Sequence, residues 1–92
     1  MTKLVQEVKI QNLKGLHARA TAAFVKTAEK FKSKITVEKP GEMCVSGKSI
    51  MGLLMLAAPL GASMTITVDG PDADKAMRAI VDLVNDRFGE GE

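Results

Sequence analysis

The spacing of apolar residues changes period several times along this chain, and these changes restrict its fold more than any other feature. Residues 4–11, 34–39 and 63–69 alternate apolar and polar side chains, as half-buried strands do. In residues 18–31 and again in residues 73–88, apolar side chains recur every three or four positions, as on one face of an amphipathic helix. A chain that mixes the two periods in this way predicts an α+β fold.

Two further elements complete the pattern in the middle of the chain. Pro40 and Gly41 form a turn dipeptide, and residues 42–46 then resume the alternation, so they are expected to pair with the preceding strand as a hairpin. Ser49 is a good N-cap residue, and it precedes a short apolar helix over residues 50–58.

The predicted order of elements is therefore βαββαβα, which favours a two-layer open-faced sandwich. We expect a four-stranded antiparallel sheet covered on one face by three helices, and residues 1–92 forming one domain. The inward stripe of the last helix is predicted to be Ala73, Met77, Ile80, Val84 and Phe88. Gly89 ends this helix, and residues 90–92 are expected to be frayed.

The predicted helix over residues 50–58 is apolar nearly all round. A chain of 92 residues builds one modest core and cannot easily bury every face of such a helix. Part of it is therefore expected at the surface, drawn from Ile50, Met51, Leu54 and Met55.

The chain contains three aromatic residues, all phenylalanine, and one cysteine. The core must therefore be largely aliphatic, and nucleic-acid binding is not expected because aromatic side chains for base stacking are scarce. A lone cysteine forms no internal disulfide, and the first residues lack the apolar core of a signal peptide, so a cytoplasmic location is expected. The longest apolar stretch, residues 50–60, is too short to span a bilayer, so membrane insertion is not expected.

Charge is distributed unevenly along the sequence. Residues 1–48 hold ten Lys and Arg against four acidic residues, a net of +6, whereas residues 49–92 hold three against seven, a net of −4. A solvated lysine surface explains the basic half. Attraction of an acidic partner or a phosphate donor is the alternative explanation.

The only histidine, His17, lies where the first strand gives way to the first helix. If the helix begins at Ala18, the free amides of Ala18, Arg19 and Ala20 and the positive end of the helix dipole surround the imidazole. The dipole disfavours the imidazolium ion, which leaves a ring nitrogen available as a nucleophile. We therefore predict that His17 carries a phosphoryl group and that Arg19 acts as its charged clamp.

No companion group for complete catalysis accompanies His17. The sequence has no second histidine, no HExxH, no CxxC and no glycine-rich phosphate loop, so neither a metal nor a cofactor is expected. The chain is therefore predicted to act as a stoichiometric phosphoryl carrier and not as a stand-alone catalyst. Partner proteins that dock over His17 would supply the donor and the acceptor.

Two motifs in register carry a resemblance to a known family. GLHAR at residues 15–19 and SGKSIMGL at residues 46–53 closely resemble the HPr family of phosphocarrier proteins, from the bacterial phosphoenolpyruvate-dependent sugar phosphotransferase system. The resemblance extends over essentially the whole chain, including the βαββαβα order and the DGP sequence at residues 69–71.

The resemblance implies a relay between proteins. Enzyme I, charged by phosphoenolpyruvate, would phosphorylate His17 at Nδ1, and the group would pass to an enzyme IIA component, with Arg19 as the clamp. Ser49 matches the serine that HPr kinase/phosphorylase modifies in many bacteria, although its role as an N-cap is a sufficient explanation without the resemblance. Partner contact is implied for Ile50, Met51 and Leu54, and a monomer is expected.

One position departs from the family pattern. The family commonly has proline directly after the arginine, whereas this chain has Ala20. Alanine preserves the helix and adds a free amide, so the phosphoryl site is expected to survive. The departure leaves two branches open: the sugar-transporting HPr type, and a nitrogen-related NPr type that acts as a regulatory docking module and signals without transporting sugar.

Overall fold

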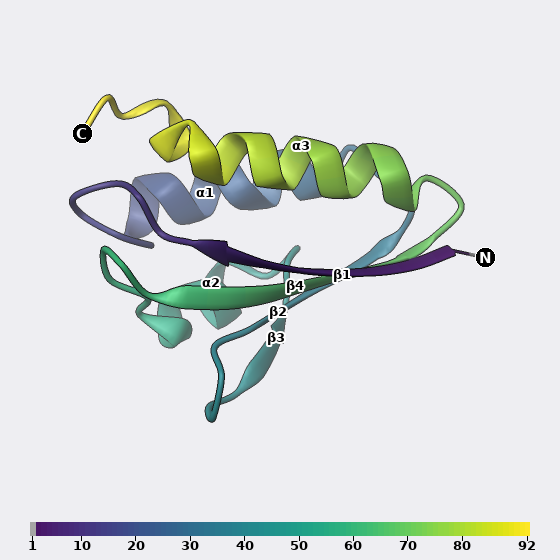
Figure 1. Cartoon of the computed structure of the whole chain (residues 1–92), viewed down its shortest axis with the longest axis horizontal. Coiled ribbons are helices and arrows are strands. Elements are labelled where there is room, and N and C mark those ends of the chain that lie inside the picture. Colours follow the sequence, from purple (N-terminus) through teal and green to yellow (C-terminus); the bar gives the residue numbers. More distant parts are fainter. Residues whose placement is uncertain (1) are drawn as a thin grey trace.

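A computed structural model of the chain describes residues 2–92 and shows one four-stranded antiparallel sheet with three α-helices (Figure 1). The strand order in the sheet is β1-β4-β2-β3. In sequence, the elements are β1 (Thr2–Lys9), α1 (Ala18–Ala28), β2 (Lys34–Glu38), β3 (Cys44–Ser46), α2 (Ile50–Leu56), β4 (Ser63–Gly70), α3 (Ala73–Asn85) and a short 3₁₀ turn, η1 (Arg87–Gly89). The predicted βαββαβα order is confirmed.

The longest ladder in the sheet joins the strands that lie far apart in sequence. β1 pairs with β4 from Thr2 opposite Gly70 to Lys9 opposite Ser63. β2 lies on the other side of β4, and β3 pairs only with β2, over three residues. This last pairing is the predicted hairpin, which leaves β3 as a short edge strand.

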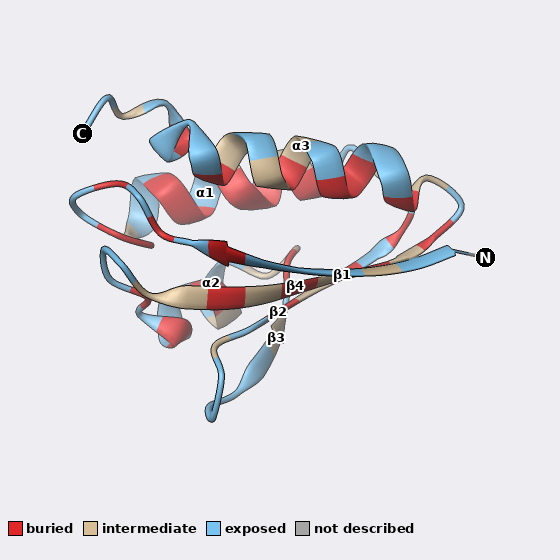
Figure 2. Ribbon diagram, viewed as in Figure 1, coloured by how far each residue is buried: buried red, intermediate tan, exposed pale blue. Residues whose placement is uncertain are grey.

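The helices cover one face of the sheet. α1 and α3 lie side by side above it, and their buried residues face the strands (Figures 1 and 2). α2 packs near α1 and β3, where a Cβ atom added at Gly52 would lie 2.9 Å from Cβ of Val45. Val45 is opposite the buried Val37, so α2 contacts the same face of the sheet as the longer helices. The fold is the predicted open-faced sandwich.

The core is aliphatic apart from two phenylalanines. β4 alternates buried and half-buried residues along its length, which confirms its predicted inward positions Met64, Ile66 and Val68. Phe24 of α1 is fully buried among aliphatic side chains. Burial on this scale stabilises the fold by about 25 cal/mol for each Å² of apolar surface removed from water.

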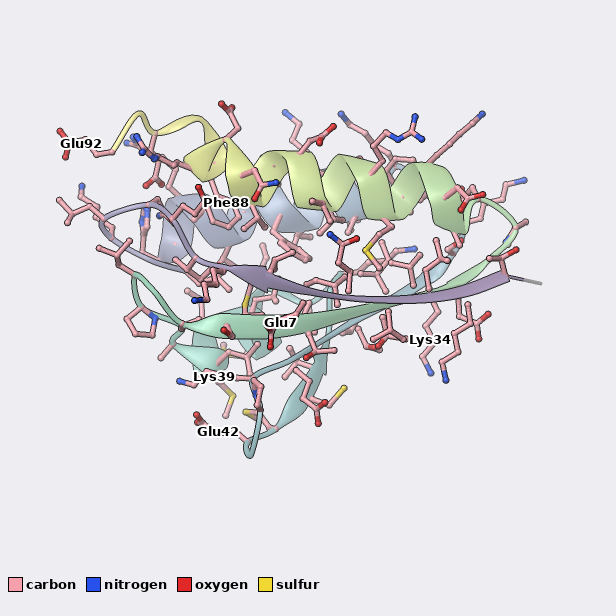
Figure 3. The ribbon with its side chains drawn as sticks, in the orientation of Figure 1. Glu7, Lys34, Lys39, Glu42, Phe88 and Glu92 are labelled. Carbon is pink, nitrogen blue, oxygen red and sulfur yellow. The ribbon has the colours of Figure 1, made fainter. Side chains whose placement is uncertain are left out.

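Both long helices end earlier than their apolar stripes predict. α1 ends at Ala28 with Glu29 as its C-cap, and the predicted helical residue Phe31 is half-buried in the loop that follows. α3 ends at Asn85, so the prediction that Phe88 belongs to its helical stripe is wrong. Phe88 is nevertheless buried, because it adopts a positive φ of 54° and turns back toward the core (Figure 3).

None of the helices within residues 2–92 combines the length and the apolar character that a transmembrane helix requires.

A carboxylate fastens the start of α3 to the loop before β2. Asp72 accepts hydrogen bonds from the backbone N–H groups of Lys32 (2.8 Å) and Ser33 (2.9 Å) and from the Ser33 hydroxyl (2.5 Å). The Ser33 hydroxyl, followed by the Lys32 amide, lowers the pKa of Asp72 from 3.8 to about 2. Ionised Asp72 therefore holds together two segments that are about forty residues apart in sequence.

We predict that Asp72→Asn lowers the free energy of unfolding above pH 3.8. The difference in this free energy between the variant and the wild type should shrink as the pH falls toward about 2. The folded-state pKa lies below the unfolded value, so the stabilisation by Asp72 is complete above the unfolded pKa and is lost on protonation of the folded state. Urea unfolding between pH 6 and pH 2 measures this difference. The control is Asp74→Asn, which changes an exposed carboxylate of the same helix turn; equal pH dependence of the two variants would contradict the prediction.

Candidate functional site

His17 is the N-cap residue of α1. Its backbone is extended (φ −88°, ψ −175°), and its carbonyl accepts from the Thr21 N–H at 2.8 Å. The Arg19 N–H donates to His17 Nδ1 at 3.4 Å, at the long end of hydrogen bonding. The predicted helix start at Ala18 is therefore confirmed, and the imidazole lies against the first turn of the helix. Ala20 is fully buried in that turn.

Gly15 shapes the loop that delivers His17 to the helix. Its φ is +68°, and a Cβ atom there would lie 2.5 Å from the carbonyl oxygen of Ala58 and 2.9 Å from Cα of Pro59. The Leu16 N–H donates to the same Ala58 oxygen at 2.8 Å. The loop before α1 is thus held directly against the segment that follows α2.

The second ring nitrogen of His17 contacts a residue that sequence reasoning missed. Nε2 lies 2.5 Å from Oε2 of Glu90, and the other carboxylate oxygen accepts from Asn12 Nδ2 at 3.0 Å. Asn12 Nδ2 also donates to the Gly15 carbonyl at 2.8 Å. Asn12 is fully buried, and its Oδ1 atom has no hydrogen-bond partner among the described residues 2–92.

Residues 90–92 are therefore ordered against the site, and the prediction that they are frayed is wrong. The chain reverses after α3 through positive φ angles at Arg87 (56°), Phe88 (54°) and Gly89 (77°). The Glu92 carbonyl then accepts from the Leu13 N–H at 2.8 Å, which places Glu92 beside the loop after β1 (Figure 3). Burial of Phe88 anchors this return.

His17 opens into a small polar pocket of about 220 Å³. The lining residues are Leu13, Lys14, His17, Arg19, Glu90 and Glu92. The side chain of His17 is 29% exposed and that of Glu90 is 11% exposed. Burial raises the pKa of Glu90, but hydrogen bonds, first from Asn12 and then from His17, outweigh it and lower the pKa overall. Glu90 is therefore a carboxylate at neutral pH.

Arg19, the predicted clamp, lines this pocket with an exposed side chain. Ser49 is the N-cap of α2, and its hydroxyl accepts from the Gly52 N–H at 3.0 Å. Leu53 and Leu56 anchor α2 in the core, whereas Ile50, Met51, Leu54 and Met55 are exposed, with Met51 at 68%. We refer to Ile50, Met51 and Leu54 as the apolar patch. The prediction that part of α2 lies at the surface is confirmed.

Within residues 2–92, no three His, Cys, Asp or Glu side chains gather in a way that would hold a metal ion. Cys44 is exposed on the edge strand β3, opposite Glu38.

We predict that Gly15→Ala destabilises the protein more than Gly41→Ala. Both glycines have a positive φ, which costs alanine about 1–2 kcal/mol at either position. Only at Gly15 does the added methyl group also collide with backbone, whereas nothing lies within 4 Å at Gly41. Urea unfolding measures both losses. Equal losses would show that the approach of Gly15 to Ala58 is not tight in solution.

Comparison with known proteins places these features in a family. A family model described as the HPr component phosphorylation site of the phosphotransferase system (PTS) matches residues 4–86. The phosphocarrier protein HPr of Neisseria meningitidis serogroup A is 52% identical over 89 residues, which cover 97% of this chain and 99% of that protein. The phosphocarrier protein NPr of Shewanella violacea is 43% identical over 90 residues, 98% of each chain.

Solved structures agree with the sequence comparisons. The crystal structure of HPr-C-His from Thermoanaerobacter tengcongensis has a TM-score of 0.87 and 42% identity, and the match covers 98% of each chain. A further HPr structure from that organism, also similar to this chain, is described as a dimer. Sequence motifs, fold and full-length similarity agree, and the chain belongs to the HPr family of phosphocarrier proteins.

Proposed function

We propose that this chain accepts a phosphoryl group on His17 Nδ1 from phosphorylated enzyme I and passes it to an enzyme IIA component. The observation that supports this most strongly is the placement of Nδ1, which faces the Arg19 amide at the N-terminus of α1. A nucleophilic nitrogen and a ready-made anion-binding group are thus adjacent in a pocket open to solvent.

The transfer requires one bond to form and one to break. The lone pair of His17 Nδ1 attacks phosphorus, and the bond between phosphorus and the donor breaks, with its electron pair returning to the donor. The phosphoryl group brings about two negative charges. The amides of Ala18, Arg19 and Ala20 lack intrahelical acceptors and would donate to its oxygens, each dipole interaction contributing about 0.3–1 kcal/mol.

The charged side chains of the pocket would complete this shallow binding site. Lys14 and Arg19 supply positive charge, and the exposed Arg19 guanidinium can pair with phosphoryl oxygens as a clamp. Because the site is open and its binding energy modest, the group can leave again to an acceptor. This suits a carrier better than an enzyme that must retain its intermediate.

The apolar patch is the proposed docking surface for both partners. It is exposed on α2, and the segment after α2 hydrogen-bonds to the loop that carries His17. A partner that covers the patch would therefore reach the imidazole in the same interface. We expect a small transient contact, below about 1,200 Å², made by a monomeric carrier in the cytoplasm.

Ser49 is the proposed regulatory site, a substrate for HPr kinase/phosphorylase. Its hydroxyl caps α2 and is half-buried at the end of the apolar patch. A phosphate at a helix N-terminus is compatible with the dipole, so the helix would persist. The added negative charge beside Ile50 and Met51 would weaken apolar docking without unfolding the protein.

A regulatory role in a nitrogen-related branch is the second candidate function, supported by the similarity to an NPr protein. In that case the output is docking to a regulatory partner, and phosphorylation of His17 tunes this contact. The two functions differ in the phenotype of His17→Ala: a carrier loses all phosphoryl flow, whereas a docking module keeps at least one regulatory partner.

We predict that incubation with enzyme I and labelled phosphoenolpyruvate places an acid-labile, base-stable label on the wild type and none on His17→Ala. These stabilities are those of a phosphohistidine, and the chain has no other histidine. Mass spectrometry of peptides kept at alkaline pH locates the label. An unlabelled wild type in the presence of active enzyme I would end the carrier proposal.

We predict that Ser49→Asp slows transfer from enzyme I about tenfold, which corresponds to a loss of about 1.4 kcal/mol in docking. Asp is also a good N-cap, so thermal stability should change little. The matched variant Ser49→Ala removes the cap without adding charge. It should lose about 1 kcal/mol of stability and keep its transfer rate; the docking argument fails if Ser49→Asp transfers at the wild-type rate.

A further inference from the structure

The contact between His17 and Glu90 has no part in the phosphoryl transfer described above. It joins residues 73 positions apart through a distance of 2.5 Å between Nε2 and Oε2. The Glu90 side chain is nearly buried, in a pocket that otherwise faces solvent. A carboxylate held so closely to the ring must influence which nitrogen carries the proton.

We propose that Glu90 is a positioning residue for phosphoryl transfer: its carboxylate holds His17 in the Nε2–H tautomer and so directs the Nδ1 lone pair toward the donor. This inference rests on the proposed carrier function. It adds a residue that lies outside both sequence motifs and outside residues 4–86, the span of the family model.

The contacts of the two ring nitrogens require the same tautomer. An ionised carboxylate can only accept, so the shared proton belongs to Nε2. The other ring nitrogen, Nδ1, accepts a hydrogen bond from the Arg19 N–H, so it carries a lone pair and no proton. At 3.4 Å this second bond is long and weak, so it leaves the lone pair available and keeps an amide near the incoming phosphoryl oxygens.

Glu90 also faces the charge that develops during the reaction. When the lone pair of Nδ1 forms the bond to phosphorus, the ring retains its Nε2 proton and becomes positively charged. The donor recovers the electron pair of its own broken bond, so no proton needs to leave His17. The carboxylate beside Nε2 is already in place to stabilise this cation, as in other histidine–carboxylate pairs.

The surrounding structure fixes Glu90 before the donor arrives. Asn12 holds the second carboxylate oxygen, and buried Phe88 anchors the turn that returns the chain to the site. The backbone bond between Leu13 and Glu92 secures the residues beyond it. Positive charge from Lys14 and Arg19 in the same pocket offsets the repulsion between Glu90 and a phosphoryl group.

The test compares Glu90→Ala and Glu90→Gln with Glu92→Gln in the full chain. Two quantities are measured: the initial rate of labelling by phosphorylated enzyme I, and the ¹⁵N chemical shifts of the His17 ring, which report the tautomer. Glu92 is the matched control, because its exposed carboxylate lines the same pocket but its bond to Leu13 uses only the backbone. Amide spectra of each variant verify that it is folded.

We predict that Glu90→Ala loses the single Nε2–H tautomer and is labelled about 10–100-fold more slowly, as when a functional histidine loses its orienting partner. Glu90→Gln retains an acceptor without the charge, so it should keep the tautomer and show an intermediate loss of rate. Glu92→Gln removes a negative charge from the same pocket without a contact to the ring, so it should keep the Nε2–H tautomer and should not be labelled more slowly than the wild type.

The opposite results would overturn the proposal in distinct ways. Unchanged rate and tautomer in Glu90→Ala would show that the contact is incidental, and faster labelling would show that residues 90–92 block the site. A Glu90→Ala protein that is labelled more slowly and yet keeps the Nε2–H tautomer would also refute positioning through the ring. If the wild type takes no label, the carrier function fails, while the ring shifts still decide whether Glu90 positions His17.

Discussion

The antiparallel pairing of β1 with β4 is the constraint on which the site depends. Because Lys9 pairs with Ser63, the chain leaving β1 and the chain entering β4 lie at the same end of the sheet. Two backbone bonds, from Ile10 to Ala62 and from Gly61 to Ile10, continue the pairing beyond the strands. This places the loop to His17 against the segment after α2. The loop that carries His17 and the segment that follows α2 are therefore neighbours because of strand register.

The surface position of His17 fits the carrier role proposed for it. His17 lies at the surface, with 29% of its side chain exposed, in a shallow polar pocket of about 220 Å³. Its environment comes from backbone amides and a few charges, and the aliphatic core between sheet and helices holds these groups in place. A protein partner could therefore reach the imidazole of His17 while the surrounding structure holds the ring in place.

Local signals allowed much of this arrangement to be predicted from sequence. The start of α1 after His17 and the capping of α2 by Ser49 both follow from short-range chemistry, and the alternation in residues 63–69 identified β4. The ends of the helices were less predictable. Phe88 fits a helical stripe by spacing, but tertiary packing places it in the core through a left-handed turn.

The parts of the site that sequence reasoning missed depend on contacts across nearly the whole chain. Asn12 and His17 contact Glu90 across 78 and 73 positions of the sequence. The periodicity of apolar residues cannot predict a contact between such distant positions. Gly89 and Gly91, which both have a positive φ, were the local signs in the sequence that the chain turns after α3. Glu90 was predicted only as part of a frayed segment over residues 90–92.

The reversal of the chain after α3 has a practical consequence for handling this protein. Glu92 lies beside the loop that carries His17, whereas Thr2, at the start of β1, pairs with Gly70 at the opposite end of the sheet (Figure 1). An affinity tag, fluorophore or surface tether attached after Glu92 would stand at the mouth of the pocket. Attachment before Thr2 leaves the pocket unobstructed, so immobilisation from that side is the appropriate geometry for binding measurements.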